Sequence, residues 1–321
     1  MISVVVPVYN SEATLGALSQ RLLASGKTWG EPFEIVLVND GSRDGSWQKI
    51  QQLQRASPEI RAVDLMRNYG QHNAVLCGIR ESRGVTIVTI DDDLQHPPEE
   101  IARVLAHLRS DVDVVYAVPQ APEHGWLRGV ASWFAKWLLQ QAMGVRLAGT
   151  ASAFRVFRAQ LREAFEVVEG PFVNIDVLLS WGTQRFSSVK VRHDPRAFGQ
   201  SNYPFRGLAR HAINMLTGFS AIPLQMATLL GLLASGFGVL VLVWVIGRYL
   251  IVGYSAPGFP FLASSLAIFS GAQLVALGVI GEYIARIHFR SMRKPAYGVR
   301  ERLGGPDASG LGARDVSEDH A

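Results

Sequence analysis

Three consecutive carboxylates, Asp91, Asp92 and Asp93, are the residues whose types and spacing most directly suggest chemistry. They follow Val85–Ile90, a run of β-branched and other apolar residues that predicts a strand buried on both faces. Gln95 comes two residues after the last of them. In an open α/β sheet, ligands bind at the carboxyl ends of such strands. The sequence therefore predicts that a buried strand brings these side chains to the ligand-binding edge of a sheet.

Successive side chains at a strand end alternate in direction, so Asp91 and Asp93 are expected to point the same way and Asp92 the opposite way. Two carboxylates that share one concavity repel each other unless a cation joins them. Mg²⁺ and Mn²⁺ prefer oxygen ligands and often complete their shell with substrate phosphates, and the amide oxygen of Gln95 could be a further ligand. The alternative is a solvated acidic turn. The strand before the acids and the glutamine after them favour the metal site.

The chain around this stretch alternates between short apolar runs and helical patterns, which predicts a mostly parallel, doubly wound α/β sheet. Strands are expected at Ile2–Val8, Phe33–Val38, Ile60–Leu65 and Val85–Ile90, and helices at about 13–25, 47–55 and in the segment ending near Glu81. The first strand is not followed by G-x-G-x-x-G, which argues against a dinucleotide site.

Two polar residues follow the second and third predicted strands and could contact a ligand at the same edge. Asp40, within NDGSRDG, could accept hydrogen bonds from a base or a ribose, or could cap the turn in which it lies. Arg67 could hold a phosphate, or could be an ordinary surface arginine. Both pairs of alternatives stay open from the residues alone.

Composition indicates a membrane protein. Of the 321 residues, 48% are hydrophobic and only 18% are charged, and the apolar excess is concentrated after Ala221. The net charge of +4 is too small to indicate nucleic-acid binding. The single cysteine, Cys77, excludes an internal disulfide and lies in an apolar run typical of a core. The sequence enters its first strand without a signal peptide, so the chemistry is expected on the cytoplasmic side.

Two long uncharged segments, Leu224–Ile246 and Phe259–Gly281, each exceed the roughly 20 residues needed to span hydrocarbon. Basic residues flank the outer ends of the pair, whereas only Arg248 flanks the loop between them. The positive-inside rule therefore puts both outer ends in the cytoplasm. The alternative is a buried core hairpin, although soluble domains rarely contain two uncharged helices of this length. The tail from Gly304 is expected to be disordered.

Three further segments carry basic residues. A tryptophan-rich apolar stripe with helical spacing runs through 125–141, and Arg128 and Ser132 share another face at a step of four. Such a helix suits a membrane interface, and the alternative is a core-packing helix with a solvated side. Phe205–Phe219 has the pattern of a basic amphipathic helix. Arg155 lies in a predicted strand, where the alternative to a functional role is an exposed strand face.

Six motifs spread from residue 2 to about residue 287 together resemble those of family-2 glycosyltransferases, in particular the polyprenyl-phosphate glycosyltransferase group. They are VVVPVYN, VLVNDGSRDGS, RNYGQHNA, IDDDLQHPPEE, FGQSNY and GEYIARI. The resemblance implies a GT-A-like fold with a divalent cofactor, Mg²⁺ or Mn²⁺. It implies inverting transfer of a sugar from a nucleotide sugar, with a UDP-sugar expected first. The acceptor would be a membrane polyprenyl phosphate, with undecaprenyl phosphate expected first, and the product would serve cell-envelope glycan modification.

The resemblance also implies roles for individual residues. The catalytic and metal-binding residues would be Asp91, Asp93 and Gln95; the donor-nucleotide residues Pro7, Tyr9, Asn10 and Asp40, joined by Arg67; and the acceptor-phosphate residues Arg128, Ser132, Arg155 and Arg196. Four residues, Pro119, Thr150, Ala153 and Asn202, depart from those that many relatives carry. These departures leave the identity of the sugar and the details of the acceptor site open.

The expected organisation is a cytoplasmic GT-A-like catalytic domain over 1–203, a juxtamembrane amphipathic helix over 204–221, a two-helix transmembrane hairpin over 222–286 and a basic, then disordered, cytoplasmic tail over 287–321. The chain would be a multi-pass protein of the inner (plasma) membrane. Its partners would be the nucleotide sugar and the polyprenyl phosphate lipid, and nucleic acid is not expected. A second copy of the chain and a flippase for the lipid-linked product are further partners compatible with the resemblance.

Two other functions compete with this one. A processive polysaccharide synthase of the same family usually carries Q-x-x-R-W, which this sequence lacks, and two spans are few for a polymer channel. A non-catalytic membrane scaffold with a degenerate transferase domain is disfavoured because Asp91, Asp93 and Gln95 are all present.

Overall fold

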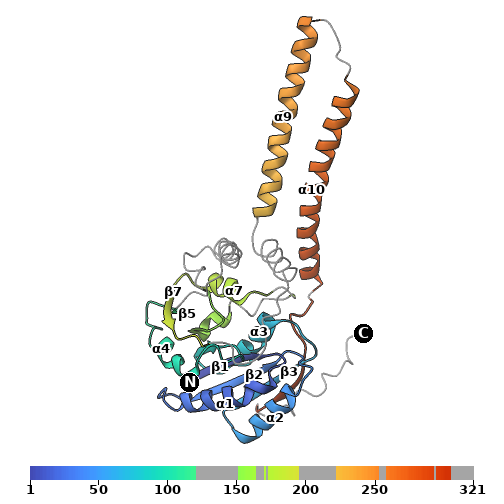
Figure 1. Cartoon of the computed structure of the whole chain (residues 1–321). Coiled ribbons are helices and arrows are strands. Elements are labelled where there is room, and N and C mark those ends of the chain that lie inside the picture. The colour runs from blue at the N-terminus through green and yellow to red at the C-terminus, as the bar shows by residue number, and fades with distance from the viewer. Residues whose placement is uncertain are drawn as a thin grey trace, which may run out of the picture. The chain divides into compact units, whose positions relative to one another are not determined.

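The structure is a computed structural model that describes residues 1–120, 151–163, 170, 173–194, 222–252, 258–292 and 294–304. The chain divides into two compact units, one formed by Met1–Asn202 with Pro295–Ala321 and the other by Tyr203–Lys294. The strands of Figure 1 belong to the first unit, and the two long helices α9 and α10 belong to the second.

The first unit is built on a mixed sheet that has eight strands within the described residues. In spatial order they are β7 (Phe186–Val191), β5 (Val114–Pro119), β6 (Arg155–Arg158), β4 (Thr86–Thr89), β1 (Ile2–Val8), β2 (Phe33–Asn39), β3 (Ile60–Leu65) and β8 (Val299–Leu303). Strands β4, β1, β2 and β3 run parallel, so their carboxyl ends meet at one edge. Strands β6 and β8 run antiparallel to their neighbours.

The predicted α/β class and the mostly parallel sheet are confirmed. Every residue of β1 is buried, as expected for a continuous apolar run at the centre of a parallel sheet. The predicted strand Val85–Ile90 is shorter in the structure, because β4 covers only Thr86–Thr89. The antiparallel pairings of β6 and β8 are findings of the structure.

Helices cover both faces of the parallel strands, which is the doubly wound arrangement. The helical segments of this unit are α1 (Glu12–Gly26), α2 (Ser46–Ala56), α3 (Gln71–Glu81), η1 (Pro98–Glu100), α4 (Ile101–Leu105), η3 (Ala159–Arg162) and α7 (Ile175–Gly182). Leu18 of α1 and Ile50 of α2 share an apolar core with Val4 of β1. On the opposite face α3 lies against the sheet so closely that a Cβ on Gly78 would be 2.3 Å from Cγ1 of Val5. Glycine at this position allows the close approach of α3.

Strand β8 lies within the region expected to form the tail, 287–321, whereas the disorder expected from Gly304 concerns residues that lie almost wholly outside the described part of the chain. Helix α10 continues to Ser291, and Val299–Leu303 then forms the edge strand beside β3, with Ala296 buried between them in sequence. The strand reads Val-Arg-Glu-Arg-Leu, and charged residues of this kind protect an exposed sheet edge from pairing with other chains. Because of these charges, β8 lacks the alternation of apolar and polar residues that predicts a strand.

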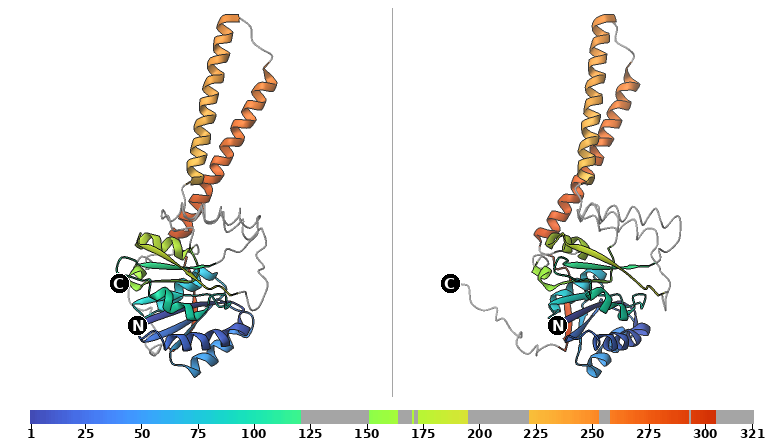
Figure 2. Two further views of the ribbon diagram at one scale, coloured as in Figure 1. Left: turned by 60° about the vertical axis from the view of Figure 1, so that its left-hand side comes forward. Right: turned by 90° about the vertical axis from the view of Figure 1, so that its left-hand side faces the viewer.

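The second unit contains two long helices, α9 (Ile222–Val252) and α10 (Phe259–Ser291). Figure 2 shows them as a pair. Within the described residues, one stretch is long and apolar enough to cross a membrane, the 25 residues Leu224–Arg248 of α9. The apolar part of α10, Phe269–Ala285, is shorter. Large apolar side chains along both helices are exposed, for example Leu240 at 70% and Leu274 at 69%.

Candidate functional site

Four loops meet at the carboxyl edge of the parallel strands, and hydrogen bonds connect them. The loop after β1 contacts the loop after β4, because the Tyr9 N–H donates to Oδ2 of Asp92 over 3.2 Å. It also contacts the loop after β2 twice. The Asn10 N–H donates to Oγ of Ser42 over 3.0 Å, and the Arg43 N–H donates to Oδ1 of Asn10 over 2.8 Å.

The loop after β3 is hydrogen-bonded to the loop after β2, and the residue that follows it is hydrogen-bonded to the loop after β4. Oδ1 of Asp40 accepts the Tyr69 N–H over 2.7 Å, and its Oδ2 accepts the Gly70 N–H over 2.9 Å, which joins the loops after β2 and β3. Nε2 of Gln71, the first residue of α3, donates to Oδ1 of Asp91 over 2.6 Å. The loops after β1, β2, β3 and β4 are thereby linked in a closed circuit around one edge of the sheet.

Two residues of this edge have a backbone conformation that side chains rarely adopt. Asn10 has a φ of 54° and Leu94 a φ of 62°. Asparagine tolerates this left-handed region, but leucine seldom does, and such strain is concentrated at functional sites. The Leu94 side chain packs against the apolar core and holds the turn. The turn separates Asp93 from Gln95, and the Gln95 N–H returns to Oδ1 of Asp93 over 3.1 Å.

The donor atoms at this turn suit a hard cation that also binds a substrate. Within the described part of the chain, no three His, Cys, Asp or Glu side chains are grouped to hold a metal ion by themselves. Asp91, Asp93 and the Gln95 amide would instead supply a partial set of oxygen ligands, which phosphates of a substrate could complete. The chemistry of the residues therefore fits Mg²⁺ or Mn²⁺.

Burial raises the pKa of two carboxyls in these loops. Asp40 is only 2% exposed, and burial raises its pKa, although the N–H groups of Tyr69 and Gly70 oppose the shift. Burial likewise raises the pKa of Asp92, opposed by hydrogen bonds from Ser11 and from the Tyr9 N–H. Both oxygens of Asp40 accept N–H groups of the loop after β3, which is neither of the two expected roles, a cap of its own turn or a direct contact with a base or ribose.

The other predicted donor-site residues lie at or beside the same edge. Pro7 is buried near the end of β1, beyond the last residue that pairs with β4. Tyr9 is 44% exposed, and Asn10 is exposed beside it. Arg67 is exposed, and its guanidinium lies 4.7 Å from the centroid of the Tyr69 ring. The structure therefore brings these predicted residues together at one edge, with Arg67 stacked on an aromatic ring.

Arg155, predicted to bind the acceptor phosphate, is 3% exposed and ion-paired with Asp176. Its Nε donates to Oγ1 of Thr89 over 3.0 Å, and the Tyr116 hydroxyl donates to the same Asp176 carboxylate over 2.9 Å. Thr89 is the last residue of β4, so this buried network lies directly behind the start of the acidic loop. The alternative of an exposed strand face is wrong for Arg155, and its buried carboxylate partner was not foreseen.

Several predicted residues lie outside the described part of the chain. They are Arg128, Ser132 and Arg196, together with Thr150 and Asn202 among the departures. Of the remaining departures, Pro119 ends β5, and the carbonyl of Ala153 accepts the Thr89 hydroxyl over 2.6 Å.

Sequence reasoning missed two parts of the site. Gln71 lies inside the motif RNYGQHNA, but nothing in the motif identifies Asp91 as its partner. The buried pair of Asn39 and Asp64, in which Nδ2 of Asn39 donates to Oδ1 of Asp64 over 2.6 Å, also went unnoticed. Asn39 stands next to Asp40 in the NDGS motif, and this position at a strand end was the one available signal.

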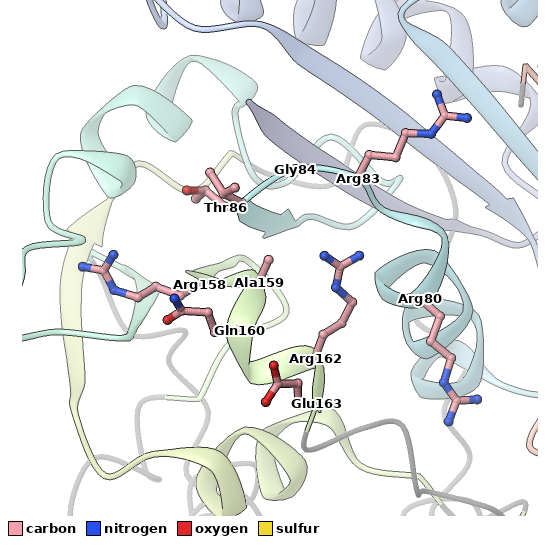
Figure 3. Close-up of a pocket in the computed structure, with 10 residues that line it drawn as sticks. Arg80, Arg83, Gly84, Thr86, Arg158, Ala159, Gln160, Arg162 and Glu163 are labelled. Atoms are coloured by element: carbon pink, nitrogen blue, oxygen red, sulfur yellow. The ribbon is translucent and has the colours of Figure 1, made fainter. Parts of the chain in front are cut away.

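A cavity of about 780 Å³ opens at the other edge of the sheet, near the start of β4. Its lining includes Arg80, Arg83, Arg158 and Arg162, with Glu163. Figure 3 shows the guanidinium of Arg162 directed towards the middle of the cavity, whereas those of Arg80, Arg83 and Arg158 extend away from one another. The cavity contains none of the predicted site residues, so the candidate site remains the edge formed by the four loops.

Comparison with known proteins identifies the family. A family model described as Glycosyl transferase family 2 matches residues 3–168. An undecaprenyl-phosphate 4-deoxy-4-formamido-L-arabinose transferase from Shewanella sediminis is 34% identical over 323 residues, which cover 99% of this chain and 97% of the relative. A protein of the same name from Pectobacterium carotovorum is 33% identical, with coverage of 99% and 98%.

Solved structures support the fold. Glucosyl-3-phosphoglycerate synthase from Mycobacterium tuberculosis, in complex with Mn²⁺ and UDP-glucose, has a TM-score of 0.51 at 17% identity. The likeness covers 68% of this chain and 77% of that one. At this level of identity the comparison speaks for the fold alone, and the predicted GT-A-like α/β architecture is confirmed.

Proposed function

This chain belongs to glycosyl transferase family 2, and we propose that it transfers a sugar from a nucleotide sugar to the phosphate of undecaprenyl phosphate. The observation that carries the proposal is similarity over almost the whole length of this chain and of relatives named for that acceptor. Their names also make 4-deoxy-4-formamido-L-arabinose the first sugar to test.

The four hydrogen-bonded loops support the proposed binding of a nucleotide-sugar donor. Tyr9, Asn10 and Arg67 are exposed at the edge where four strands end, and the acidic loop lies beside them. A nucleotide seated there would have its diphosphate near Asp91 and Asp93. The hydrogen bonds that connect the loops hold these groups in place before the donor arrives, which lowers the ordering cost of binding.

Asp91, Asp93 and Gln95 would hold Mg²⁺ or Mn²⁺, which, when bound, offsets the negative charge that develops on the departing nucleoside diphosphate. The chain's own residues orient this loop. Gln71 fixes one oxygen of Asp91, the Gln95 N–H fixes one oxygen of Asp93, and Asp92 ties the loop to Tyr9.

The acceptor needs no protein base in this proposal. A phosphate monoester has its second pKa near 6, so its attacking oxygen is already mostly anionic at neutral pH. Attack on the anomeric carbon from the face opposite the leaving diphosphate inverts that carbon. Arg128, Ser132 and Arg196 are proposed to bind the acceptor phosphate, since arginine donates charge-assisted hydrogen bonds to phosphate. Buried Arg155 would position the start of the acidic loop through Thr89.

Chain connectivity supports two membrane spans, and the basic residues that flank the outer ends of the two helices support a cytoplasmic catalytic unit on the inner membrane. Strands β7 and β8 belong to one sheet, yet α9 and α10 lie between them in the sequence. If Leu224–Arg248 crosses the membrane, the chain must cross back before β8 can join β3. Helix α10 is the described helix available for the return, and its 33 residues are ample in length.

The two competing functions are less well supported. A membrane scaffold with a degenerate transferase domain is disfavoured because Asp91, Asp93 and Gln95 are all present. The alternative of a buried core hairpin for the two long helices is disfavoured because Leu240 and Leu274 are exposed. A processive synthase would need a polymer channel, and the described residues offer two long helices. A second copy of the chain and a flippase for the product remain candidate partners of the proposed enzyme.

The experiment that tests the proposal is a donor panel. The purified chain in lipid nanodiscs would be mixed with undecaprenyl phosphate and each of several labelled nucleotide sugars, including UDP-4-deoxy-4-formamido-L-arabinose. Appearance of a labelled lipid phosphosugar with one donor supports the proposal and identifies the sugar. Product of increasing length would favour a synthase, and no transfer with any donor would favour a scaffold.

A further inference from the structure

Arg300 connects β8, the strand that follows the two long helices, to the loops of the candidate site. It lies in β8, and its Nη1 is 3.2 Å from Oδ2 of Asp64, at the end of β3. Its Nη2 donates to the carbonyl of Met66 over 2.9 Å. Asp64 is buried, with 1% exposure, whereas the Arg300 side chain is 57% exposed. A surface arginine therefore supplies the charge partner of a buried carboxylate.

The first of these contacts leads to the loop after β2. The other oxygen of Asp64 accepts Nδ2 of Asn39 over 2.6 Å, and Oδ1 of Asn39 accepts the Ser42 N–H over 3.3 Å. Oγ of Ser42 in turn accepts the Asn10 N–H. The chain of contacts from Arg300 thus reaches the loops after β2 and β1, which carry predicted donor-nucleotide residues.

The second contact leads to the loop after β3. Besides the bond from Arg300 to its carbonyl, Met66 donates its N–H to the carbonyl of Gly298 over 2.9 Å. Gly298 also lies against Tyr69, because a Cβ at this position would be 3.1 Å from the Tyr69 hydroxyl. Tyr69 is the residue on which Arg67 stacks and whose N–H Asp40 accepts. The segment before β8 and Arg300 therefore contact this loop at Met66 and Tyr69.

We propose that Arg300 is a positioning residue for the donor nucleotide: it fixes the loops after β2 and β3 without itself contacting the nucleotide. The inference rests on the proposed function for the identity of the ligand. It adds that donor affinity depends on a strand located beyond both long helices in the sequence.

Arg302 offers a matched control on the same strand. It is 53% exposed, close to the exposure of Arg300, and its Nε is 2.8 Å from Oε1 of Glu81 at the end of α3. This ion pair joins β8 to α3 and does not involve the loops of the site. Arg300→Ala and Arg302→Ala therefore each remove one arginine and one ion pair from β8, but only the first removes contacts to the loops.

The test compares wild type, Arg300→Ala, Arg300→Lys and Arg302→Ala as full chains in nanodiscs. UDP with Mg²⁺ is the binding probe, and hydrogen exchange of the amides of Met66–Gly70 is the structural readout. Arg300→Ala should raise the Kd for UDP by about fivefold or more and speed exchange of these amides, since it removes two charge-assisted contacts. Arg302→Ala should change either readout by less than about twofold, and Arg300→Lys should fall between wild type and Arg300→Ala.

The steady-state constants separate positioning from general damage. Arg300→Ala should raise KM for the nucleotide sugar and leave KM for undecaprenyl phosphate within about twofold of wild type. Equal effects of the two alanine variants, equal effects on both substrates, or unchanged exchange at Met66–Gly70 would each overturn the inference. A wild-type chain that fails to bind any nucleotide would instead overturn the proposed function and, with it, the ligand named here. The exchange readout would then still decide whether Arg300 holds the loops.

Discussion

The side-chain amide of Gln71 donates a 2.6 Å hydrogen bond to Oδ1 of Asp91. Gln71 begins α3, whereas Asp91 follows β4, so the bond joins two segments that are adjacent only in the folded sheet. A carboxylate held in this way has one oxygen fixed, which sets the orientation of the whole group. The geometry makes Gln71 the outer partner of a proposed metal ligand, and such partners commonly contribute tenfold to a hundredfold to affinity or activity.

Substitution of Gln71 should therefore produce a graded loss. Gln71→Leu is expected to lower kcat/KM by about tenfold and to raise the Mg²⁺ concentration needed for half-maximal activity. Asp91→Ala should reduce activity to background, because the proposed metal ligand itself is removed. Titration of activity with Mg²⁺ for each variant measures both effects. An unchanged metal requirement in Gln71→Leu would separate Gln71 from the metal site.

Activity should depend on a divalent metal, and the loss of activity should differ among alanine variants of the three acids. Activity is expected to disappear in excess EDTA and to return with Mg²⁺ or Mn²⁺, and Asp93→Ala should behave like Asp91→Ala. Asp92→Ala should be milder, because the Asp92 carboxylate accepts the Tyr9 N–H and is not one of the proposed metal ligands. Transfer assays on the three alanine variants provide the comparison. Full activity in EDTA would refute the cation, and Asp92→Ala as the most damaging of the three would refute the assignment of ligands.

The buried pair of Arg155 and Asp176 should control stability. Asp176→Asn leaves an uncompensated guanidinium in the core, a change that typically costs about 3–5 kcal/mol. The matched control is Glu99→Gln, which breaks a partly exposed ion pair with Arg21 and should cost about 1 kcal/mol or less. Thermal unfolding of both variants tests the difference. Equal shifts in Tm would mean that the Arg155 charge is not confined to the core.

Topology can be tested without removal of the native cysteine. Burial raises the pKa of Cys77 to about 12, so the thiol stays protonated and unreactive at any pH well below that value, including pH 8. Only introduced thiols should then react with an impermeant maleimide on intact cells. Gly258→Cys, between α9 and α10, should be labelled, and Glu301→Cys, on β8, should be labelled only after lysis. The reverse pattern would place the catalytic unit outside the cytoplasm.

The pH dependence of transfer should report the acceptor rather than a protein base. The rate is expected to rise through the ionisation of the lipid phosphate near pH 6 and then to level off. Thr150 stands where relatives often carry an acid, and Thr150→Ala should cost about tenfold or less, as expected for one neutral hydrogen bond. Initial rates at saturating donor between pH 5 and 9 supply the profile. A thousandfold loss in a folded, membrane-bound Thr150→Ala would contradict base-free attack.

Local sequence was sufficient to predict the central strands of the sheet, but it was insufficient to predict the edge strand β8. Ile2–Val8 was predicted to the residue, because a continuous apolar run has few other stable positions than a central parallel strand. Val299–Leu303 was missed, because alternating charges on an edge strand resemble those of a solvated tail. The acidic loop was identified from its own residues. By contrast, the bonds from Gln71 to Asp91 and from Arg300 to Asp64 depend on chain segments whose proximity only the folded sheet determines.

The place of β8 in the sequence also sets an order of biosynthesis. A ribosome releases β1, β2 and β3 long before Val299, and both long helices emerge in between. Until then the outer edge of β3 is unpaired, and Asp64 lacks the charge of Arg300. Domains generally begin to fold while the chain is still being made. If α9 and α10 cross the membrane as proposed, a nascent chain stalled before or during insertion would carry an incomplete form of the proposed nucleotide site. Sugar transfer would then begin only once the chain has returned from the bilayer.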